Sequence, residues 1–285
     1  MAESIPLVSI VMATYNRANS IKRAIESALA QSYENLELII VDDGSTDHTK
    51  SVVEPCLKDP RVRYFYKENQ GSNVYPMNRG VEISGGKYVA ILDDDDIWSD
   101  KDKIKKQVEF LEKNKEYVLV GGGAIKIDRN GKEIVRYLMP EKDKDIRQKI
   151  LISSMFVHVS VLFKKDAFVE VGGYDEQFGG AADWDLWMKL GRIGKFYNIP
   201  EYLVTYTAHR ADSLGYVEKN HKKLEWLKIN INLKKKYSKN YPHYIRGLIF
   251  CWLGYFYSLL PIKRILWPFM FKMRSKIFGD FKSNG

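Results

Sequence analysis

The sequence has few cysteines and lacks the common glycine loops that bind phosphate. Cys56 and Cys251 are its only cysteines in 285 residues. They cannot build a four-cysteine metal site, and two isolated thiols are typical of a reducing compartment. No G-x-G-x-x-G follows the first strand-like run, and G-x-x-x-x-G-K-[ST] and G-x-S-x-G do not occur. Dinucleotide binding, P-loop nucleotide binding and a nucleophile elbow are therefore disfavoured.

The sequence also lacks a secretion signal and an apolar run of membrane-spanning length. The first 17 residues have no basic stretch, and their apolar run is short and ends in polar residues. A signal peptide needs a basic stretch followed by a longer apolar run, so we expect the N-terminal part to be cytosolic. A spanning helix needs roughly 20 apolar residues, whereas the uncharged run at residues 247–262 has sixteen and is broken by Pro261.

Positive charge is concentrated near the C-terminal end. The net charge is +9, but the residues from Gly215 onward hold 15 Lys and Arg against three acids, a net charge of +12, which leaves −3 for the rest. In the same part, the aromatic runs at residues 247–262 and 265–271 flank Lys263 and Arg264. Aromatic side chains mixed with basic ones are typical of helices that lie in a membrane surface.

We therefore predict a globular domain at residues 1–215 and a helical, basic and aromatic tail at residues 216–285 that associates with a membrane. This places the protein in the cytoplasm, attached peripherally to the cytoplasmic face of a membrane. The alternative is a helical pair that packs on the domain or on another subunit. Nucleic acid is not expected as a partner, because the basic residues flank apolar surface rather than an isolated polar groove.

Apolar runs of strand length alternate with helical patterns in the first part of the chain. The runs are residues 7–13, 36–41, 61–66 and 88–92. Strands that are apolar throughout and separated by helices predict an α/β fold with a Rossmann-like, mostly parallel sheet flanked by helices. Ligands bind at the carboxyl ends of such strands, so the polar residues that directly follow them are the candidates for function.

The middle of the chain is less regular. Residues 117–127 and 133–137, joined by a turn at residues 129–131, predict a β-hairpin. Further strands are expected at residues 156–163, 195–199 and 202–207, and helices near Asp183 and over residues 217–239.

Four consecutive aspartates directly follow the strand at residues 88–92. Carboxylates held this close repel one another, and a divalent cation bound to diphosphate oxygens would relieve the repulsion. The spacing of Asp93 and Asp95 lets two side chains point the same way from an extended segment. An acidic run is by itself more often a solvated turn, but its place between a buried strand and Ile97-Trp98 favours a metal site.

A second acidic turn, residues 42–47, ends the strand at residues 36–41. A carboxylate here can accept hydrogen bonds from a base N–H or a ribose hydroxyl. The alternative is turn chemistry, in which Thr46 or Asp47 caps the next helix. Both interpretations can hold, with Asp43 for the ligand and Asp47 for the cap.

Two further candidates lie later in the chain. Asp183, Trp184 and Asp185 follow the Gly179-Gly180 loop, where a carboxylate can act as a general base or as a helix cap. His209 follows the strand at residues 202–207. A single histidine is more often structural, but His209 becomes a candidate metal ligand if its loop folds over the aspartates.

Together these residues resemble glycosyltransferase family 2, whose members have the GT-A fold. The resemblance covers residues 6–215 and depends on motifs in a fixed order. These are VSIVMATYNR at 8–17, VDDGSTD at 41–47, NRG at 78–80, GKY at 86–88, LDDDDIW at 92–98 with Lys103 and Gln107 beyond it, GGYDE at 172–176, and DWDLWMKL at 183–190. No single motif decides, but the ordered series is specific.

The resemblance implies a role for each matching residue. Tyr15 and Asp43 would contact the nucleoside, with Asp43 at the uracil edge, and Asp93 would approach the ribose. Asp95 would bind Mn²⁺ or Mg²⁺ that bridges the diphosphate, with His209 as a further metal ligand or phosphate contact. Asp183 would be the catalytic base, with Trp184 and Asp185 on the acceptor side. The donor-binding set is Thr14, Tyr15, Arg17, Asp43, Asn78, Asp93 and Asp94.

Two positions depart from the family pattern. Ala182 stands where members often have an acidic residue beside the base, and Met77 stands where many have Arg. The first removes a side chain that could orient the base, and the second removes a donor contact. Neither departure affects Asp95 or Asp183.

The resemblance and the tail together predict an inverting, metal-dependent transfer of sugar from a nucleotide-sugar, preferably a UDP-sugar. The acceptor would be a hydroxyl of a glycan or lipid-linked molecule in cell-surface polysaccharide, lipid-linked oligosaccharide or glycolipid assembly. One alternative is a sugar nucleotidyltransferase, which would need a glycine-rich loop where residues 13–17 read ATYNR. The other is a membrane-tethered nucleotide-sugar-binding protein without catalysis, for which Ala182 is the only hint.

Overall fold

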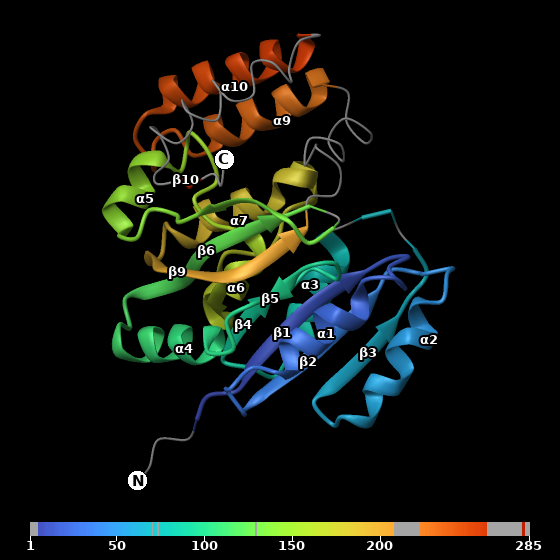
Figure 1. Ribbon diagram of the computed structural model, residues 1–285. Coiled ribbons are helices and arrows are strands. Elements are labelled where there is room, and N and C mark those ends of the chain that lie inside the picture. Colours follow the sequence, from blue (N-terminus) through green and yellow to red (C-terminus); the bar gives the residue numbers. More distant parts are fainter. Residues whose placement is uncertain are drawn as a thin grey trace.

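The computed structural model describes residues 5–69, 71–72, 74–128, 130–207, 223–260 and 281–282. Within them, one sheet of ten strands runs through the molecule and is flanked by helices (Figure 1). The strands are β1 (Val8–Thr14), β2 (Leu36–Asp42), β3 (Val62–Tyr66), β4 (Tyr88–Ile91), β5 (Ile97–Trp98), β6 (Tyr117–Ile127), β7 (Glu133–Tyr137), β8 (Leu162–Lys164), β9 (Lys195–Thr207) and β10 (Phe281–Lys282).

The α-helices of the described residues are α1 (Ile21–Leu29), α2 (Thr49–Val53), α3 (Val74–Glu82), α4 (Lys103–Lys113), α5 (Asp143–Lys149), α6 (Lys165–Glu170), α7 (Ala182–Leu190), α9 (Lys223–Lys236) and α10 (Tyr244–Leu259). Short 3₁₀ helices are η1 (Glu54–Lys58), η2 (His158–Ser160) and η3 (Glu176–Ala181).

The sheet is mixed. Its first half, in the order β4-β1-β2-β3, is parallel, as the apolar runs predict. The second half is largely antiparallel: β8 pairs with β4 and β6, and β7 pairs with β6, while β9 runs parallel to β6. The predicted α/β class is confirmed, and the parallel half places the ends of β1, β2 and β4 at one edge.

Strand β1 alternates between two hydrophobic cores on opposite faces of the sheet. Val8, Ile10 and Met12 lie in the core that includes α1 and α4. Val11 points the other way, into the core that includes α3 and α7. Successive side chains of a strand point to opposite faces, so a run of apolar residues without alternation is what a sheet covered on both sides requires.

The strand predicted at residues 156–163 is wrong for most of its length. Residues 158–160 form η2, and only Leu162–Lys164 is extended. The Ser160 hydroxyl donates to the Val157 carbonyl at 2.8 Å and accepts from the Gly122 N–H at 3.1 Å, while the buried Gln107 amide donates to the Ser160 carbonyl at 2.7 Å. Side chains thus take over hydrogen bonds that a sheet ladder would otherwise make.

The two strands predicted at residues 195–199 and 202–207 are one continuous strand, β9. Its pairing with β6 shifts register beside Gly122 and Gly123. A side chain at Gly123 would come within 2.9 Å of the Glu201 carbonyl oxygen. The glycines leave room for the irregular part of β9, which contains Pro200.

Helix α9 packs into the core of the domain. Leu233 of α9, and Tyr237 and Tyr241 just after its end, belong to the hydrophobic core that includes α7. The Tyr241 hydroxyl also donates to the Met188 carbonyl of α7 at 2.8 Å. The predicted domain boundary between residues 215 and 216 lies outside the described residues.

Helix α10 lies beside α9, on the far side of the molecule from β1–β3 (Figure 1). Gly247 allows a close approach, because a side chain there would stand 2.6 Å from the Leu151 carbonyl oxygen. The outer face of α10, together with Leu260 just after it, exposes a stripe of apolar side chains: Ile245, Ile249, Trp252, Leu253, Phe256, Leu259 and Leu260. No helix among the described residues has the length and apolarity to cross a membrane. The second aromatic run, residues 265–271, lies outside them.

Candidate donor and catalytic site

The loop after β1 is fastened to the acidic turn after β2. Asn16 has a left-handed backbone with φ of 55°, which asparagine tolerates better than most residues. Its side-chain oxygen accepts the N–H groups of Thr46 at 2.8 Å and Asp47 at 3.2 Å. Its own N–H donates to the Ser45 hydroxyl at 2.9 Å. This fastening, which sequence reasoning missed, places Tyr15 at the surface and Arg17 over the sheet edge.

The two adjacent aspartates of the acidic turn have different tasks. Asp42 is fully buried and accepts the Tyr64 hydroxyl at 2.5 Å and the Ser45 N–H at 2.7 Å, so it holds the turn together. Asp43 forms an ion pair with Lys67, with 2.8 Å between Oδ1 and Nζ. The same ammonium lies 3.9 Å from the ring centroid of Tyr75. The predicted nucleoside contact Asp43 therefore lies beside an aromatic ring and a cation.

The aspartates after β4 form a compact turn, closed by a 3.2 Å hydrogen bond from the Asp96 N–H to the Asp93 carbonyl. Arg17 faces this turn: its Nε lies 3.2 Å from Asp94 Oδ1 and 3.7 Å from Asp95 Oδ2. Burial raises the pKa of Asp94 to about 7; Asp95 and Asp93 add to this shift, and Thr14 and Arg17 oppose it. Burial and the charges of Asp93 and Asp95 also raise the pKa of Asp96 well above its ordinary value.

These carboxylates suit a divalent cation. Burial is the main cause of the raised pKa values of Asp94 and Asp96, and the neighbouring aspartate charges add to it. Carboxylate oxygens are the ligands that Mg²⁺ and Mn²⁺ prefer. The part of the chain that the structure describes assembles no group of three metal-ligating side chains. The predicted ligand His209 lies outside it, within residues 208–222.

Asp183 lies in the first turn of α7, after a kink at Gly179, whose φ is 45°. Its Oδ1 accepts the Trp184 N–H at 2.7 Å. Burial raises the pKa of Asp183, while His158 and this backbone hydrogen bond act in the opposite direction; Asp93 raises it further. Asp183 and Asp93 therefore share one electrostatic environment, although 90 residues separate them in sequence.

His158 joins these two parts of the site. Its Nδ1 lies 3.4 Å from Asp93 Oδ1, and its Nε2 lies 3.2 Å from the Tyr174 hydroxyl. Burial by itself would lower the pKa of His158, but the carboxylates of Asp93 and Asp183 raise it above its ordinary value. The sequence assigned no role to His158, which lies in no motif, or to Tyr174, which lies in the GGYDE motif at 172–176 but was given no contact there.

The structure places the predicted acceptor-side residues Trp184 and Asp185 in the interior, each with partners inside the protein. Trp184 is 8 % exposed and donates its indole N–H to the Ile150 carbonyl at 2.7 Å. Asp185 is fully buried; it accepts the Tyr237 hydroxyl at 2.7 Å and pairs with Lys236 and Lys189 at 2.8 Å each. Both side chains point into the packing of α7 against α9, so an acceptor cannot reach them in this arrangement.

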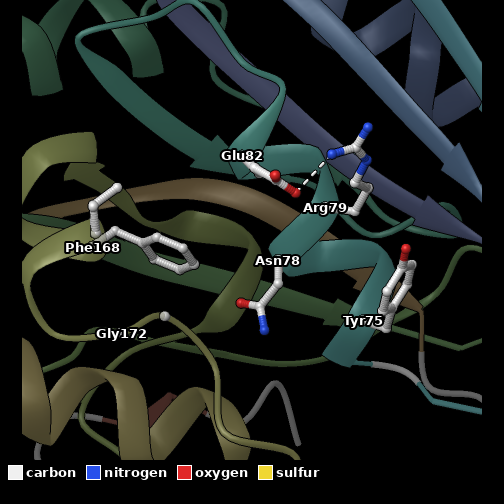
Figure 2. A pocket seen from close by; sticks show the side chains of 8 residues that line it. Tyr75, Asn78, Arg79, Glu82, Phe168 and Gly172 are labelled. Atoms are coloured by element: carbon white, nitrogen blue, oxygen red, sulfur yellow. Dashed lines mark hydrogen bonds and ion pairs between the residues drawn. The ribbon is translucent and has the colours of Figure 1, made fainter.

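Asn78 also has a structural task. Its amide donates to the Tyr174 carbonyl and accepts the Tyr174 N–H, each at 2.9 Å. Asn78 thereby fixes the loop that carries the partner of His158, and a direct donor contact is no longer the simplest role for it. Figure 2 shows its side chain between α3 and this loop, in a surface pocket that Arg79 and Glu82 border as an ion pair of 2.7 Å.

The family model described as "Glycosyl transferase family 2" matches residues 9–172, more than half of the chain. The chain belongs to glycosyltransferase family 2. An uncharacterized glycosyltransferase of Methanocaldococcus jannaschii is 31% identical over 261 residues, which cover 90% of this chain and 87% of that protein.

Other relatives of this glycosyltransferase are longer proteins. An uncharacterized glycosyltransferase of Rickettsia bellii is 35% identical over 198 residues, 67% of this chain but 28% of that protein. A chondroitin synthase of Pasteurella multocida is 31% identical over 241 residues, 84% of this chain and 24% of that protein. The chain thus spans less than a third of the length of both.

Two solved structures have the same fold. S. aureus TarS 1-349 in complex with UDP-GlcNAc has a TM-score of 0.66 at 17% identity, covering 89% of this chain and 73% of that one. The mannosyltransferase PcManGT from Pyrobaculum calidifontis, in complex with GDP-Man and Mn²⁺, has a TM-score of 0.63 at 18% identity, covering 87% and 69%. The fold of this glycosyltransferase is GT-A.

Proposed function

We propose that this family 2 member is an inverting, metal-dependent glycosyltransferase that takes a sugar from a nucleotide-sugar, preferably a UDP-sugar. One observation carries the proposal: the acidic turn after β4 faces Arg17 and contacts His158 through Asp93, and the charges of both Asp93 and His158 act on the carboxylate of Asp183. Direct transfer requires the groups that hold the donor diphosphate and the base that activates the acceptor to face the same sugar. The complexes of the two fold relatives with UDP-GlcNAc and GDP-Man support a nucleotide-sugar donor.

The donor would lie across the ends of β1, β2 and β4. Asp43 would accept a hydrogen bond from the N–H of the base, and the exposed Tyr15 would flank the nucleoside. Arg17, 48 % exposed, would leave its position over Asp94 and Asp95 to contact the diphosphate. Asp93, whose side chain is 45 % exposed, would accept a hydrogen bond from a ribose hydroxyl.

The metal would be held by Asp95, with Mn²⁺ or Mg²⁺ as the ion and His209 as a further ligand. When bound, such an ion neutralises the charge that develops on the departing diphosphate. Asp95 lies in the turn that already carries excess negative charge, and Arg17 offers it one cation at 3.7 Å. The Mn²⁺ present with GDP-Man in the mannosyltransferase complex supports this assignment.

Asp183 would act as the general base. Its carboxylate takes the proton of an acceptor hydroxyl while the hydroxyl oxygen attacks the anomeric carbon; the bond from that carbon to the diphosphate oxygen breaks, and its electron pair leaves with the nucleoside diphosphate. Attack from the face opposite the leaving group inverts the anomeric centre. Burial raises the pKa of Asp183 and so makes it a better proton acceptor, while His158 favours the ionised form from which it must start.

The acceptor would be a glycan or lipid-linked molecule at the cytoplasmic face of a membrane, with α10 resting on the lipid surface. The stripe on α10 is apolar and aromatic, and exposed Arg246 and Lys228 lie on α10 and α9. Basic side chains around an apolar face suit an anionic bilayer. Assembly of a cell-surface polysaccharide agrees with the chondroitin synthase among the relatives. A nucleotidyltransferase is disfavoured by the family, and the non-catalytic alternative by the partly exposed carboxylate of Asp183, which an acceptor hydroxyl can reach.

The test is release of nucleoside diphosphate from a panel of nucleotide-sugars with Mn²⁺, using wild type and Asp183→Asn. We expect the wild type to turn over one donor preferentially, and Asp183→Asn to lose about 100-fold or more in kcat while its donor binding stays unchanged. Turnover that survives in Asp183→Asn would refute the assignment of the base. Donor binding without turnover by the wild type, across many acceptors, would support the non-catalytic alternative.

A further inference from the structure

His158 occupies the junction between the two halves of the proposed site. It lies in η2, between the end of β4 and the loop that leads to α7. Its two ring nitrogens face opposite ways, one toward Asp93 and one toward the Tyr174 hydroxyl. Its ring centroid is 6.2 Å from that of Trp187, which lies one turn after Asp183 on α7.

Neighbouring contacts fix the ring rather than leave it to move. Tyr174 is 5 % exposed, and the side-chain amide of Asn78 bonds to both its backbone N–H and its backbone carbonyl. Trp187 is fully buried and packs against Phe156 at 5.9 Å and Phe163 at 6.3 Å. A shift of η2 would therefore disturb the donor-side carboxylate and the base helix together.

We propose that His158 is a positioning residue for sugar transfer, which ties the donor-side carboxylate Asp93 to the acceptor-side loop at Tyr174 and places a positive charge beside the base Asp183. This inference rests on the proposed function. Nδ1–H can donate to Asp93 in either charge state of the ring, whereas Nε2 donates to the Tyr174 oxygen when the ring is protonated and accepts the Tyr174 O–H when it is neutral. The carboxylates of Asp93 and Asp183 raise the pKa of His158 and so favour the protonated ring. The charged groups that face the ring are Asp93 after β4 and Asp183 on α7.

The two contacts have separable consequences. The hydrogen bond to Tyr174 fixes orientation, and a misplacement of about 1 Å near a reacting group can cost on the order of 100-fold in rate. The charge acts on Asp183 through space: it favours the carboxylate, so its loss makes the base protonate at higher pH. Neither consequence requires His158 to touch a substrate.

The experiment compares wild type, His158→Gln and Tyr174→Phe in the pH dependence of kcat, with the preferred nucleotide-sugar and Mn²⁺. His158→Gln should lower kcat by about 10- to 100-fold and move the acid limb of the profile to higher pH, with KM for the donor changed less than kcat. Tyr174→Phe should lower kcat but leave the acid limb in place, because the positive charge remains. His48→Gln, which changes an exposed histidine, is the matched control.

Metal-dependent binding of UDP separates this inference from the proposed function. A His158→Gln protein that binds UDP as the wild type does and shows an unmoved acid limb, or an unchanged kcat, would overturn the positioning role while leaving the proposed function intact. A wild type that neither binds nor cleaves a nucleotide-sugar would overturn both. If His158→Gln fails to fold, Tyr174→Phe decides: unchanged kcat in that variant contradicts the inference.

Discussion

Lys234 of α9 is a buried amine at the junction of three helices. It is 1 % exposed, and its Nζ lies 3.8 Å from the ring centroid of Trp184 on α7, with the Cys251 thiol of α10 also beside it. Burial lowers the pKa of Lys234 from 10.5 to about 8, and Cys251 opposes the shift only in part. The charged amine is therefore a cost to the folded state at neutral pH.

The size of that cost follows from linkage. Between the two pKa values the unfolded chain binds more protons than the folded one, so the free energy of unfolding rises with pH in this window. Below pH 8 the shift lowers the free energy of unfolding by roughly 3 kcal/mol. About 2.5 kcal/mol of this loss is regained by pH 10, where most of the Lys234 amine is neutral in the folded state. Lys234→Met removes the charge and shortens the side chain by one atom, so the free energy of unfolding of this variant has no pH dependence from position 234.

The assay is denaturant unfolding of wild type and Lys234→Met at pH 7 and pH 10. The stability advantage of Lys234→Met over wild type should fall by about 2.5 kcal/mol between the two pH values, whatever the lost cation–π contact with Trp184 contributes at both. Lys235→Met, a change of the exposed neighbouring lysine, should show no such dependence. A difference between Lys234→Met and wild type that is the same at pH 7 and pH 10 would refute the reasoning.

Two further predictions concern the C-terminal helices. Asp185→Asn leaves Lys236, Lys189 and Tyr237 without their buried carboxylate. Thermal unfolding should show a free energy of unfolding lower by about 3 kcal/mol. Asp145→Asn, which changes an exposed acid of α5, is the control. An unchanged melting temperature would show that this ion pair does not hold α9 to α7. Leu253→Ser/Phe256→Ser should lower binding to vesicles with anionic lipid by about tenfold or more, whereas Ile134→Ser, an exposed apolar position on β7, should not. Equal binding of all three proteins would contradict a role for the α10 stripe.

The order of the elements in the first half of the chain could be predicted from the sequence. Four apolar runs became β1 to β4 within one residue at each end, and the hairpin strands β6 and β7 have the predicted bounds. These segments are buried on both faces or end in strong turn residues, so local pattern and tertiary structure agree. The sites at their ends, Asp43, Asp93 and Asp95, follow from the same logic.

Other features depend on contacts that a single sequence does not reveal. Residues 156–163 read as a strand, but Gln107 and Ser160 draw the backbone into η2. Asp185 was expected on the acceptor side, but its carboxylate is buried and paired with Lys236, 51 residues away. His158 has no local signal, because its partners come from β4 and from the loop before α7. Long-range packing decided each of these positions.

The central claim is that the turn after β4 binds a nucleotide diphosphate through a metal ion held by Asp95. Calorimetric titration of UDP into the protein with Mn²⁺, then with EDTA, and again with Asp95→Ala, tests it most directly, with Asp145→Ala as the control for loss of one surface carboxylate. We predict binding with Mn²⁺ that disappears with EDTA and in Asp95→Ala but persists in Asp145→Ala. Equal UDP binding by Asp95→Ala and wild type would contradict the metal site, and the absence of UDP binding under every condition would contradict the uridine donor.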